Sequence, residues 1–443
     1  MVVSRIFSGG STPQQIQIII ILLVITLVVA LVSRRLRLPY TLVLVFVGLI
    51  IGFLPLLSST HLDPDVVLFL FLPALLFEGA WNVEVERLRQ DWLLVLLLAV
   101  FGLLISLMLL AAILHFGLGM DWLVAILLGA MISPTDPVAV IALLRQLGMS
   151  DRLRTIIEGE SLFNDGVGAA VFEITLIALL PTLGLAHAVE PSVIVLILNV
   201  LWLILGGFAL GIGIAWLVTR LLRRVDDYLI EITVTFSVAY GVYLLGVALH
   251  TSGLLAVVGA GLVLGSFSRK IGMSERTLDA AHDVWEFIGY VANSLLFLLL
   301  GIQIGKTNLF NAVPGILWAF VGVVLGRVLM VYLLTPFHDA IARYYQKRDL
   351  HRTTSTRSFV SAPRSLPVIW RPLIILSGLR GALSIALVLS LPGNFPGLSL
   401  LTDIVYGVVL ITLLGQGLGL HLLLPYWHQE DSVEALEVTS AEP

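Results

Sequence analysis

Thirteen apolar stretches, separated by short polar or turn-forming segments, fill most of this 443-residue chain. Their approximate limits are 16–33, 40–57, 66–80, 92–114, 122–145, 156–181, 192–220, 228–249, 253–268, 284–304, 313–336, 371–391 and 400–425. A helix needs about 20 apolar residues to cross a bilayer. Only 12% of the residues are charged, against about 25% in a soluble domain. The sequence therefore predicts an all-α polytopic membrane protein with about 13 transmembrane helices.

The distribution of basic residues predicts the orientation of these helices. If the N-terminus lies outside, Arg5 and Lys306 fall in outside loops and Arg327 and Arg380 fall within spans. Every other Lys and Arg then lies in an inside loop, as the positive-inside rule requires. We therefore expect a cytoplasmic C-terminus, a basic cytoplasmic loop at 337–370 and a short cytoplasmic tail at 426–443. The net charge of −4 gives no reason to expect a nucleic-acid partner, and the absence of cysteine excludes thiolate metal sites.

Two acidic motifs lie within the predicted spans: SPTDP at residues 133–137 and ESLFNDG at residues 160–166. A charged side chain at the bilayer centre costs roughly 2.5–3.5 kcal/mol on insertion scales, so such residues mark ion or proton pathways by default. The pair of motifs predicts a cation transporter coupled to protons.

Two of the predicted helices carry strong interruptions. Pro134 and Pro137 each remove a backbone donor and disfavour helical geometry at the preceding residue, so the fifth span is expected to unwind around Thr135 and Asp136. The twelfth span contains SGLRG at residues 377–381, with glycines on both sides of a lone arginine. These spans are seven apart and run in opposite directions. They predict an inverted repeat with two broken crossing helices, in which spans 1–6 repeat as spans 8–13.

Helical spacing groups the polar residues of the sixth span. Asp165 follows Ser161 by one turn, and Asn164 follows Glu160 in the same way, so each pair shares a face. Asp136 and the Thr135 carbonyl from the broken span are expected to complete a site with Asp165 and Ser161. All are hard oxygen ligands, suited to Na⁺ or Li⁺ rather than to a transition metal.

The remaining buried charges have simpler interpretations. Arg380 keeps its charge and needs a partner, for which Glu160 is the preferred candidate. Glu78 is expected to line the site or its cytoplasmic entrance. Arg327 is interpreted as a packing or interface charge. Glu173, Glu231 and Glu286 are interpreted as structural hydrogen-bonding groups.

Other functional classes fit less well. A cation channel would need a continuous pore, and no TVGYG-type filter or acidic ring is present. An intramembrane aspartyl hydrolase would need Gly-x-Gly-Asp, whereas residues 117–121 read GLGMD, with one residue too many. A cluster of carboxylates repels anions. The choice among Na⁺, Li⁺ and K⁺ stays open, and the alternatives kept are a cation channel and a K⁺/H⁺ antiporter.

The two acidic motifs resemble the signatures of the NhaP/NHE branch of the monovalent cation:proton antiporters. The segments FLFLPALLFE at 69–78 and GLRGALS at 378–384 are also similar to that family. The matches occur in the expected order and cover about residues 16–425.

The resemblance implies a thirteen-helix fold similar to NhaA and NapA. It implies a core domain at about 92–181 and 313–425 and a dimerisation or scaffold domain at about 16–80 and 192–304. It further implies a homodimer in a prokaryotic plasma membrane, with elevator-type movement of the core. The protein would be a secondary transporter rather than an enzyme, would need no cofactor, and would serve sodium extrusion and pH homeostasis.

The resemblance also implies roles for single residues. Asp165 would be the essential carboxylate, for which Na⁺ and H⁺ compete, with Asp136, Ser161 and the Thr135 backbone as cation ligands. Asn164 belongs to the Asn-Asp form of the motif, which is associated with electroneutral one-for-one exchange. Glu160 with Arg380 would be the ion pair of the core. Cytoplasmic Na⁺, or another monovalent cation, would then leave in exchange for external H⁺.

Overall fold

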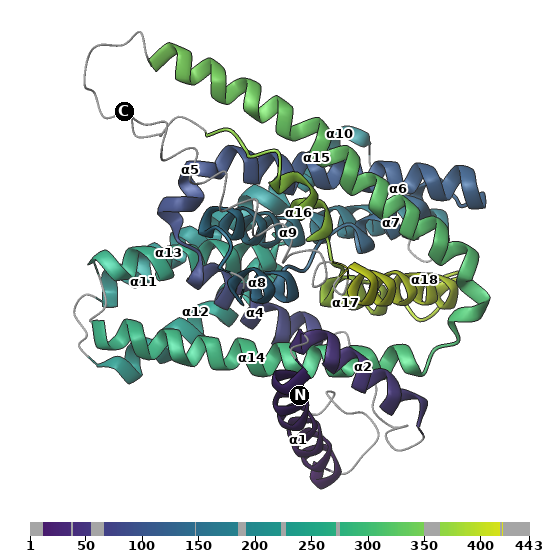
Figure 1. The fold of residues 1–443 in the computed structure, drawn as a ribbon, viewed down its shortest axis with the longest axis horizontal. Coiled ribbons are helices and arrows are strands. Elements are labelled where there is room, and N and C mark those ends of the chain that lie inside the picture. The colour runs from purple at the N-terminus through teal and green to yellow at the C-terminus, as the bar shows by residue number, and fades with distance from the viewer. Residues whose placement is uncertain are drawn as a thin grey trace.

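The computed structural model describes residues 12–36, 39–54, 66–146, 148–184, 192–222, 227–271, 275–349, 364–416 and 419. Every regular element within these ranges is a helix, and the helices pack side by side into one bundle (Figure 1). Arg5, residues 350–363 of the predicted loop and the predicted tail at 426–443 lie outside the described residues. The prediction of an all-helical fold is confirmed.

The first half of the chain forms helices up to a long helix that carries the second acidic motif. The elements are α1 (Thr12–Leu36), α2 (Tyr40–Phe53), α4 (Leu72–Asn82), α5 (Val85–Leu96), α6 (Leu103–Leu118), α7 (Trp122–Ile132), α8 (Val138–Gln146) and α9 (Asp151–Thr182). Short π-helical segments at Val67–Phe71 and Leu97–Gly102 lead into α4 and join α5 to α6.

The second half continues in the same way. The elements are α10 (Val193–Leu201), α11 (Gly207–Leu222), α12 (Tyr228–Ala248), α13 (Gly253–Ile271), α14 (Glu275–Gly305), α15 (Val313–Asp349), α16 (Trp370–Leu376), α17 (Ala382–Leu389) and α18 (Leu398–Ile411). A π-helical segment at Trp202–Gly206 joins α10 to α11, another at Thr412–Gln416 extends α18, and a short 3₁₀ turn at Leu309–Ala312 precedes α15.

Seven helices in the described residues are long and apolar enough to cross a membrane. They are Val85–Leu118, Asp151–Thr182, Ile194–Leu222, Tyr228–Ala248, Thr277–Gly305, Leu309–Tyr345 and Leu398–Gln416. All thirteen predicted segments overlap helices, but that all thirteen cross a membrane stays a prediction. One expected boundary is wrong: α15 continues past 336 to Asp349, so the first part of the predicted loop is helical.

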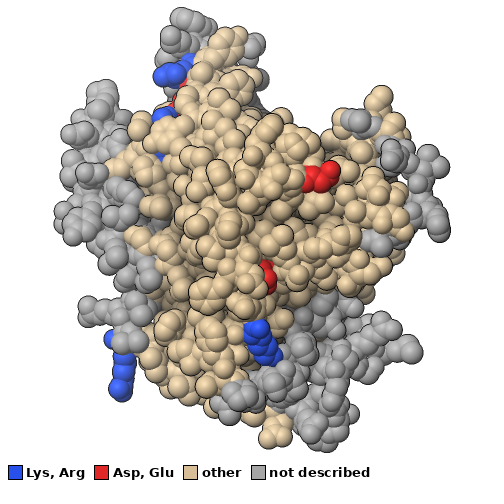
Figure 2. Space-filling model, turned by 90° about the vertical axis from the view of Figure 1, so that its right-hand side faces the viewer, with Lys and Arg blue, Asp and Glu red and all other residues tan. Residues whose placement is uncertain are grey.

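The outer surface is largely apolar. Large hydrophobic side chains such as Leu27, Ile194, Trp202 and Leu333 are exposed, and the face in Figure 2 is broadly uncharged with few isolated charged residues. A soluble monomer rarely exposes apolar patches on this scale. The surface fits contact with lipid hydrocarbon.

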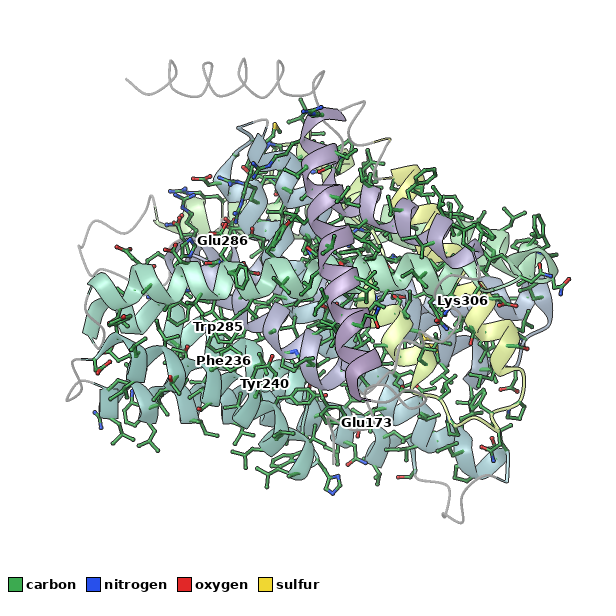
Figure 3. All side chains as sticks on the ribbon, turned by 90° about the horizontal axis from the view of Figure 1, so that it is seen from below. Glu173, Phe236, Tyr240, Trp285, Glu286 and Lys306 are labelled. Carbon is green, nitrogen blue, oxygen red and sulfur yellow. The ribbon has the colours of Figure 1, made fainter. Side chains whose placement is uncertain are left out.

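Helix α14 is fixed on both sides by close packing. Against α2, a Cβ atom added at Gly301 would lie only 2.9 Å from the Cα of Gly48, so the two backbones nearly touch. Against α12 and α4, the Trp285 ring stacks on Phe236 with centroids 5.2 Å apart and lies 4.4 Å from Phe77. Its Nε1 donates to Thr235 Oγ1 at 3.0 Å. Figure 3 shows Trp285 and Phe236 close together. This packing makes α14 a fixed wall beside the site described below.

The two predicted helix breaks are confirmed. Helix α7 ends at Ile132 and α8 begins at Val138, while α16 ends at Leu376 and α17 begins at Ala382. The two unwound segments meet, because the Asp136 backbone N–H donates to the Leu379 carbonyl at 2.8 Å. Non-helical backbone from both breaks therefore lies side by side within the bundle, where neighbouring protein satisfies its polar groups.

Candidate functional site

Helix α9 fixes the geometry of the unwound segment between α7 and α8. The Asn164 amide donates from Nδ2 to Thr135 Oγ1 at 2.8 Å, and its Oδ1 accepts from the Thr135 backbone N–H at 3.3 Å. The Ser161 hydroxyl donates to the Thr135 carbonyl. Because three groups of Thr135 are held by α9, the break has one defined position relative to Asp165.

Asp136 lies two residues before the start of α8. Its Oδ1 accepts from the Val138 backbone N–H at 3.0 Å, which caps the first turn of α8. The remaining carboxylate oxygen faces Gly381 in the other break. A Cβ atom added at Gly381 would lie 2.8 Å from Asp136 Cγ, so only glycine allows the two breaks to approach this closely at that point.

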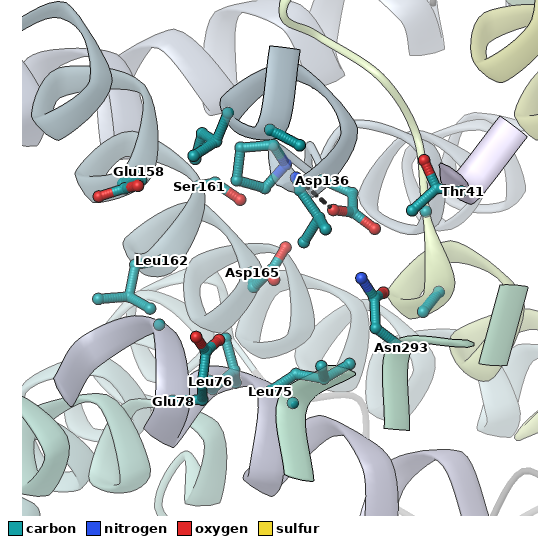
Figure 4. Close-up of a pocket in the computed structure, with 18 of the residues that line it drawn as sticks. Thr41, Leu75, Leu76, Glu78, Asp136, Glu158, Ser161, Leu162, Asp165 and Asn293 are labelled. Carbon is teal, nitrogen blue, oxygen red and sulfur yellow. Dashed lines mark hydrogen bonds between the residues drawn. The ribbon is translucent and has the colours of Figure 1, made fainter. Parts of the chain in front are cut away.

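The predicted site residues line one cavity of about 390 Å³. Asp136, Ser161 and Asp165 line it from the two acidic motifs, together with Thr135. Figure 4 shows the carboxylates of Asp136 and Asp165 turned toward the same space. Neither forms an ion pair within the part of the chain that the structure describes. The structure thus brings together the four residues that the sequence proposed as cation ligands.

The cavity leads to a polar mouth. Glu78 lines it, as predicted, and accepts a hydrogen bond from Asn82 Nδ2 at 2.6 Å. Glu158 lies 3.5 Å from the exposed Arg145, and both also line the cavity. Glu286 stands at its exposed edge. Because Arg145 belongs to a predicted inside loop, the mouth faces the side that the sequence predicts to be cytoplasmic.

The predicted pairing of Glu160 with Arg380 is wrong. Glu160, which is 1% exposed, forms a bidentate ion pair with Arg327 of α15, with Nη2 3.0 Å from Oε2. Arg327 also donates from Nε to the Ile374 carbonyl at 3.1 Å and from Nη2 to Ser377 Oγ at 3.4 Å. Arg327 is therefore an ion-pair residue that ties α9 and α15 to the second break, in place of the packing charge expected from the sequence.

Arg380 is used differently, for a reason that lies in the proline motif. In a continuous helix, the carbonyls of Ser133 and Pro134 would accept from the N–H groups of residues 137 and 138. Pro137 has no N–H, and the Val138 N–H is taken by Asp136. Arg380 Nη1 donates to both orphaned carbonyls, at 3.0 Å to that of Pro134. The guanidinium of the second break thus satisfies the carbonyl groups that the first break leaves without a helical partner.

Three other acidic residues were expected to be structural. Glu231 is buried and engaged in an interaction, whereas Glu173 is exposed. Glu286 lies at the cavity mouth, which sequence reasoning missed. Its position on the same face of α14 as Gly289 and Asn293, at spacings of three and four residues, was the available signal.

The arrangement suits a small monovalent cation or a proton. The cavity offers carboxylate, hydroxyl and carbonyl oxygens, which are hard ligands. No cluster of three or more His, Cys, Asp or Glu residues that would hold a resident metal ion occurs among the described residues. The carboxylates can hold a proton as well as contact a cation.

Comparison with known proteins places this geometry in a family. The family model for the transmembrane domain of sodium/hydrogen exchangers matches residues 19–425. The low-affinity Na⁺/H⁺ antiporter NhaS1 of Synechocystis sp. is 36% identical over 409 residues, which cover 91% of this chain and 73% of that protein. The Na⁺/H⁺ antiporter ApNhaP of Aphanothece halophytica is 37% identical over 389 residues, with coverages of 88% and 69%.

A solved structure has the same fold. The sodium proton antiporter MjNhaP1 of Methanocaldococcus jannaschii gives a TM-score of 0.71 at 19% identity, over 94% of this chain and 97% of that one. The chain belongs to the sodium/hydrogen exchanger family, whose members are transporters and not enzymes. The resemblance to NhaP-type cation:proton antiporters that the motifs predicted is confirmed.

Proposed function

We propose that this member of the sodium/hydrogen exchanger family moves Na⁺ out of the cytoplasm in exchange for H⁺. One observation carries the proposal. Asp136 and Asp165 face one cavity without an ion-pair partner among the described residues, although the neighbouring Glu160 has a bidentate one. Two unpaired carboxylates in such a site need either a cation or a proton. That requirement is sufficient to couple the two fluxes.

Competition for Asp165 provides the mechanism. A bound cation favours the ionised carboxylate, and departure of the cation into water leaves a site in which a proton replaces it. Asp136, Ser161 and the Thr135 backbone complete the cation shell. The empty, fully ionised site crosses the membrane poorly, because its charge is uncompensated. An inward proton gradient therefore drives Na⁺ outward.

We further propose electroneutral one-for-one exchange. The residue before Asp165 is Asn164, a neutral amide whose two polar atoms are engaged with Thr135. It holds the break in position and adds no titratable group to the motif. One carboxylate then carries either one Na⁺ or one H⁺ in each direction.

The finer architecture is part of the same proposal. Thirteen membrane-crossing helices form an inverted repeat, with the N-terminus outside and the C-terminus in the cytoplasm. The core, at about 92–181 and 313–425, carries the site past a scaffold at about 16–80 and 192–304 in an elevator-type movement. The scaffold forms a homodimer in a prokaryotic plasma membrane. The polar mouth beside Arg145, on the predicted inside, supports a conformation open to the cytoplasm.

Proton movement in proteoliposomes tests the exchange. The purified protein is reconstituted, an acid-inside gradient is imposed, and a trapped pH dye reports the response to external Na⁺, Li⁺ or K⁺. Dissipation by Na⁺ in the wild type, absent with Asp165→Asn, supports the proposal. An equal rate with membrane potential clamped or free supports one-for-one exchange. A proton flux that follows K⁺ alone makes the protein a K⁺/H⁺ antiporter, and no response to any monovalent cation contradicts the proposal.

A cation channel remains the alternative from a different class. Single-channel currents across a planar bilayer would support it, because a channel conducts without a coupled proton. We expect no unitary currents, because the proposed exchange moves ions only by alternating access.

A further inference from the structure

The wall opposite the two carboxylates has a polar surface of its own. Helix α14 contributes Glu286, Gly289, Tyr290 and Asn293 to the cavity lining. These positions recur every three or four residues, so they form one face of the helix. The face runs from the exposed Glu286 to the partly buried Asn293.

The side chain of Asn293 points toward the carboxylates. Figure 4 shows its amide directed toward the space between Asp136 and Asp165. The amide makes no hydrogen bond to any residue that the structure describes. Its neighbour Ser294 differs in this respect: Ser294 is 1% exposed, donates to the Tyr290 carbonyl at 2.5 Å and accepts from the Tyr40 hydroxyl at 2.8 Å.

A second polar group on the same wall is also without a partner. Thr41, at the first turn of α2, lines the cavity, is 6% exposed, and its hydroxyl oxygen is buried without a hydrogen bond in the described part of the chain. Polar groups in such positions are unfavourable unless water or a ligand satisfies them. Of the two groups, the Asn293 amide is the one directed toward the carboxylates, where it can meet a hydrated cation.

We propose that the Asn293 amide oxygen contacts the transported cation, within its hydration shell, when the cavity is open to the predicted cytoplasmic side. The inference rests on the proposed exchange and extends it to a residue of the scaffold. An amide oxygen is a hard ligand without charge, so it stabilises the cation without competing for the proton. Thr41 lines the same cavity from α2.

The location of Asn293 in the scaffold limits the proposed contact to one side of the membrane. Asp136, Ser161 and Asp165 belong to the core ranges, whereas Asn293 and Thr41 belong to the scaffold ranges. A core that moves relative to the scaffold carries the carboxylates away from Asn293. The amide therefore acts on cation binding from one side of the membrane only, whereas the carboxylates act from both sides.

Sided transport kinetics test this inference. Labelled Na⁺ uptake is measured in inside-out vesicles, where the cavity faces the added Na⁺, and in right-side-out vesicles. Asn293→Leu keeps the size of the side chain and removes its oxygen. We expect the half-saturating Na⁺ concentration to rise about tenfold from the cavity side, the factor for loss of roughly one hydrogen bond to a charged group, with little change from the other side. Maximal velocity should change less than half-saturation.

Two further variants separate cation contact from helix packing. Asn293→Asp keeps an oxygen at the same position and should hold half-saturation at or below the wild-type value. Ser294 lies on the same helix and makes buried hydrogen bonds, but it does not line the cavity. Ser294→Ala should therefore leave half-saturation unchanged on both sides. Failure of Asn293→Asp to restore affinity, or an effect of Ser294→Ala equal to that of Asn293→Leu, would assign Asn293 to helix packing.

The outcomes distinguish this inference from the proposed function. If the wild type exchanges Na⁺ for H⁺ and Asp165→Asn does not, the function stands whatever Asn293 does. Unchanged or equally raised half-saturation on both sides in Asn293→Leu then overturns only the role of the amide. Absence of exchange in the wild type overturns both.

Discussion

Two carboxylates of one helix have opposite environments. Glu160 and Asp165 lie on α9, little more than one turn apart. Glu160 is almost fully buried and forms an ion pair with both Nη atoms of Arg327. Asp165 faces a cavity shared with Asp136 and forms no ion pair with a described residue.

The difference indicates that one helix carries a structural carboxylate, Glu160, and a carboxylate proposed for transport, Asp165. A buried charge is stable when a matched partner and hydrogen bonds replace its water. Glu160 has both, so its charge is balanced within the protein. Asp165 has no ion-pair partner among the described residues, so in the proposed mechanism a transported Na⁺ or a proton balances its charge. In this proposal, Arg327 is the permanent counter-ion of Glu160, whereas Asp165 stays available to Na⁺ and H⁺.

The largest expected effect is loss of exchange on neutralising the open carboxylates. In the proposed mechanism, Asp165→Asn removes the group for which Na⁺ and H⁺ compete, and Asp136→Asn removes the second carboxylate of the site. Each variant should lose Na⁺-dependent proton movement in proteoliposomes, while thermal unfolding in detergent stays close to that of the wild type. Wild-type exchange by correctly folded Asp165→Asn would remove the distinction between the two carboxylates.

Substitutions in the Glu160–Arg327 pair should instead lower the stability of the fold. Glu160→Gln or Arg327→Leu leaves an uncompensated buried charge or unfilled donors, at a cost of about 3–5 kcal/mol. We expect a marked fall in thermal unfolding temperature and in purified yield. The double variant Glu160→Gln with Arg327→Leu should recover part of the loss. Equal stability of Glu160→Gln and wild type would show that the pair is not structural.

Sequence reasoning predicted the broken helices because their causes are local. Pro134, Pro137 and the glycines at 378 and 381 act within a few residues, so both breaks were found where the structure has them. The oxygen-rich face of α9 also follows from helical spacing alone.

The ion pair was missed because it depends on packing over long range. Glu160 and Arg327 are 167 positions apart, and the sequence offered two buried arginines for one carboxylate. The choice is made by the orphaned carbonyls of Ser133 and Pro134, which occupy Arg380. The polar wall at Asn293 was missed for the same reason, since only the folded bundle brings α14 opposite α9.

A smaller effect is expected where the two breaks touch. Gly381→Ala would place a methyl group against the Asp136 carboxylate, and such overpacking costs about 1–3 kcal/mol. Displacement of Asp136 should weaken Na⁺ affinity and slow exchange without abolishing it. Gly393→Ala is a matched control, because nothing lies within 4 Å of a Cβ atom added there. Equal kinetics of the two variants would contradict the close contact.

The smallest effect is expected at the hydroxyl ligand. Ser161→Ala removes one proposed cation ligand and the hydrogen bond to the Thr135 carbonyl. Loss of about 1 kcal/mol should raise the apparent KM for Na⁺ roughly fivefold and leave maximal turnover near the wild-type value. Uptake of labelled Na⁺ over a range of concentrations measures both quantities. An unchanged KM would remove Ser161 from the ligands.

Proton release on cation binding tests the central claim most directly. Na⁺ is added to the purified protein in weakly buffered detergent solution, and the released protons are measured together with the bound Na⁺. Competition for one carboxylate predicts one proton released per Na⁺ bound at acidic pH, with neither binding nor release in Asp165→Asn. Glu160→Gln, if enough folded protein is obtained, should release protons as the wild type does. Na⁺ binding without proton release would contradict the account, because cation and proton would then occupy separate sites.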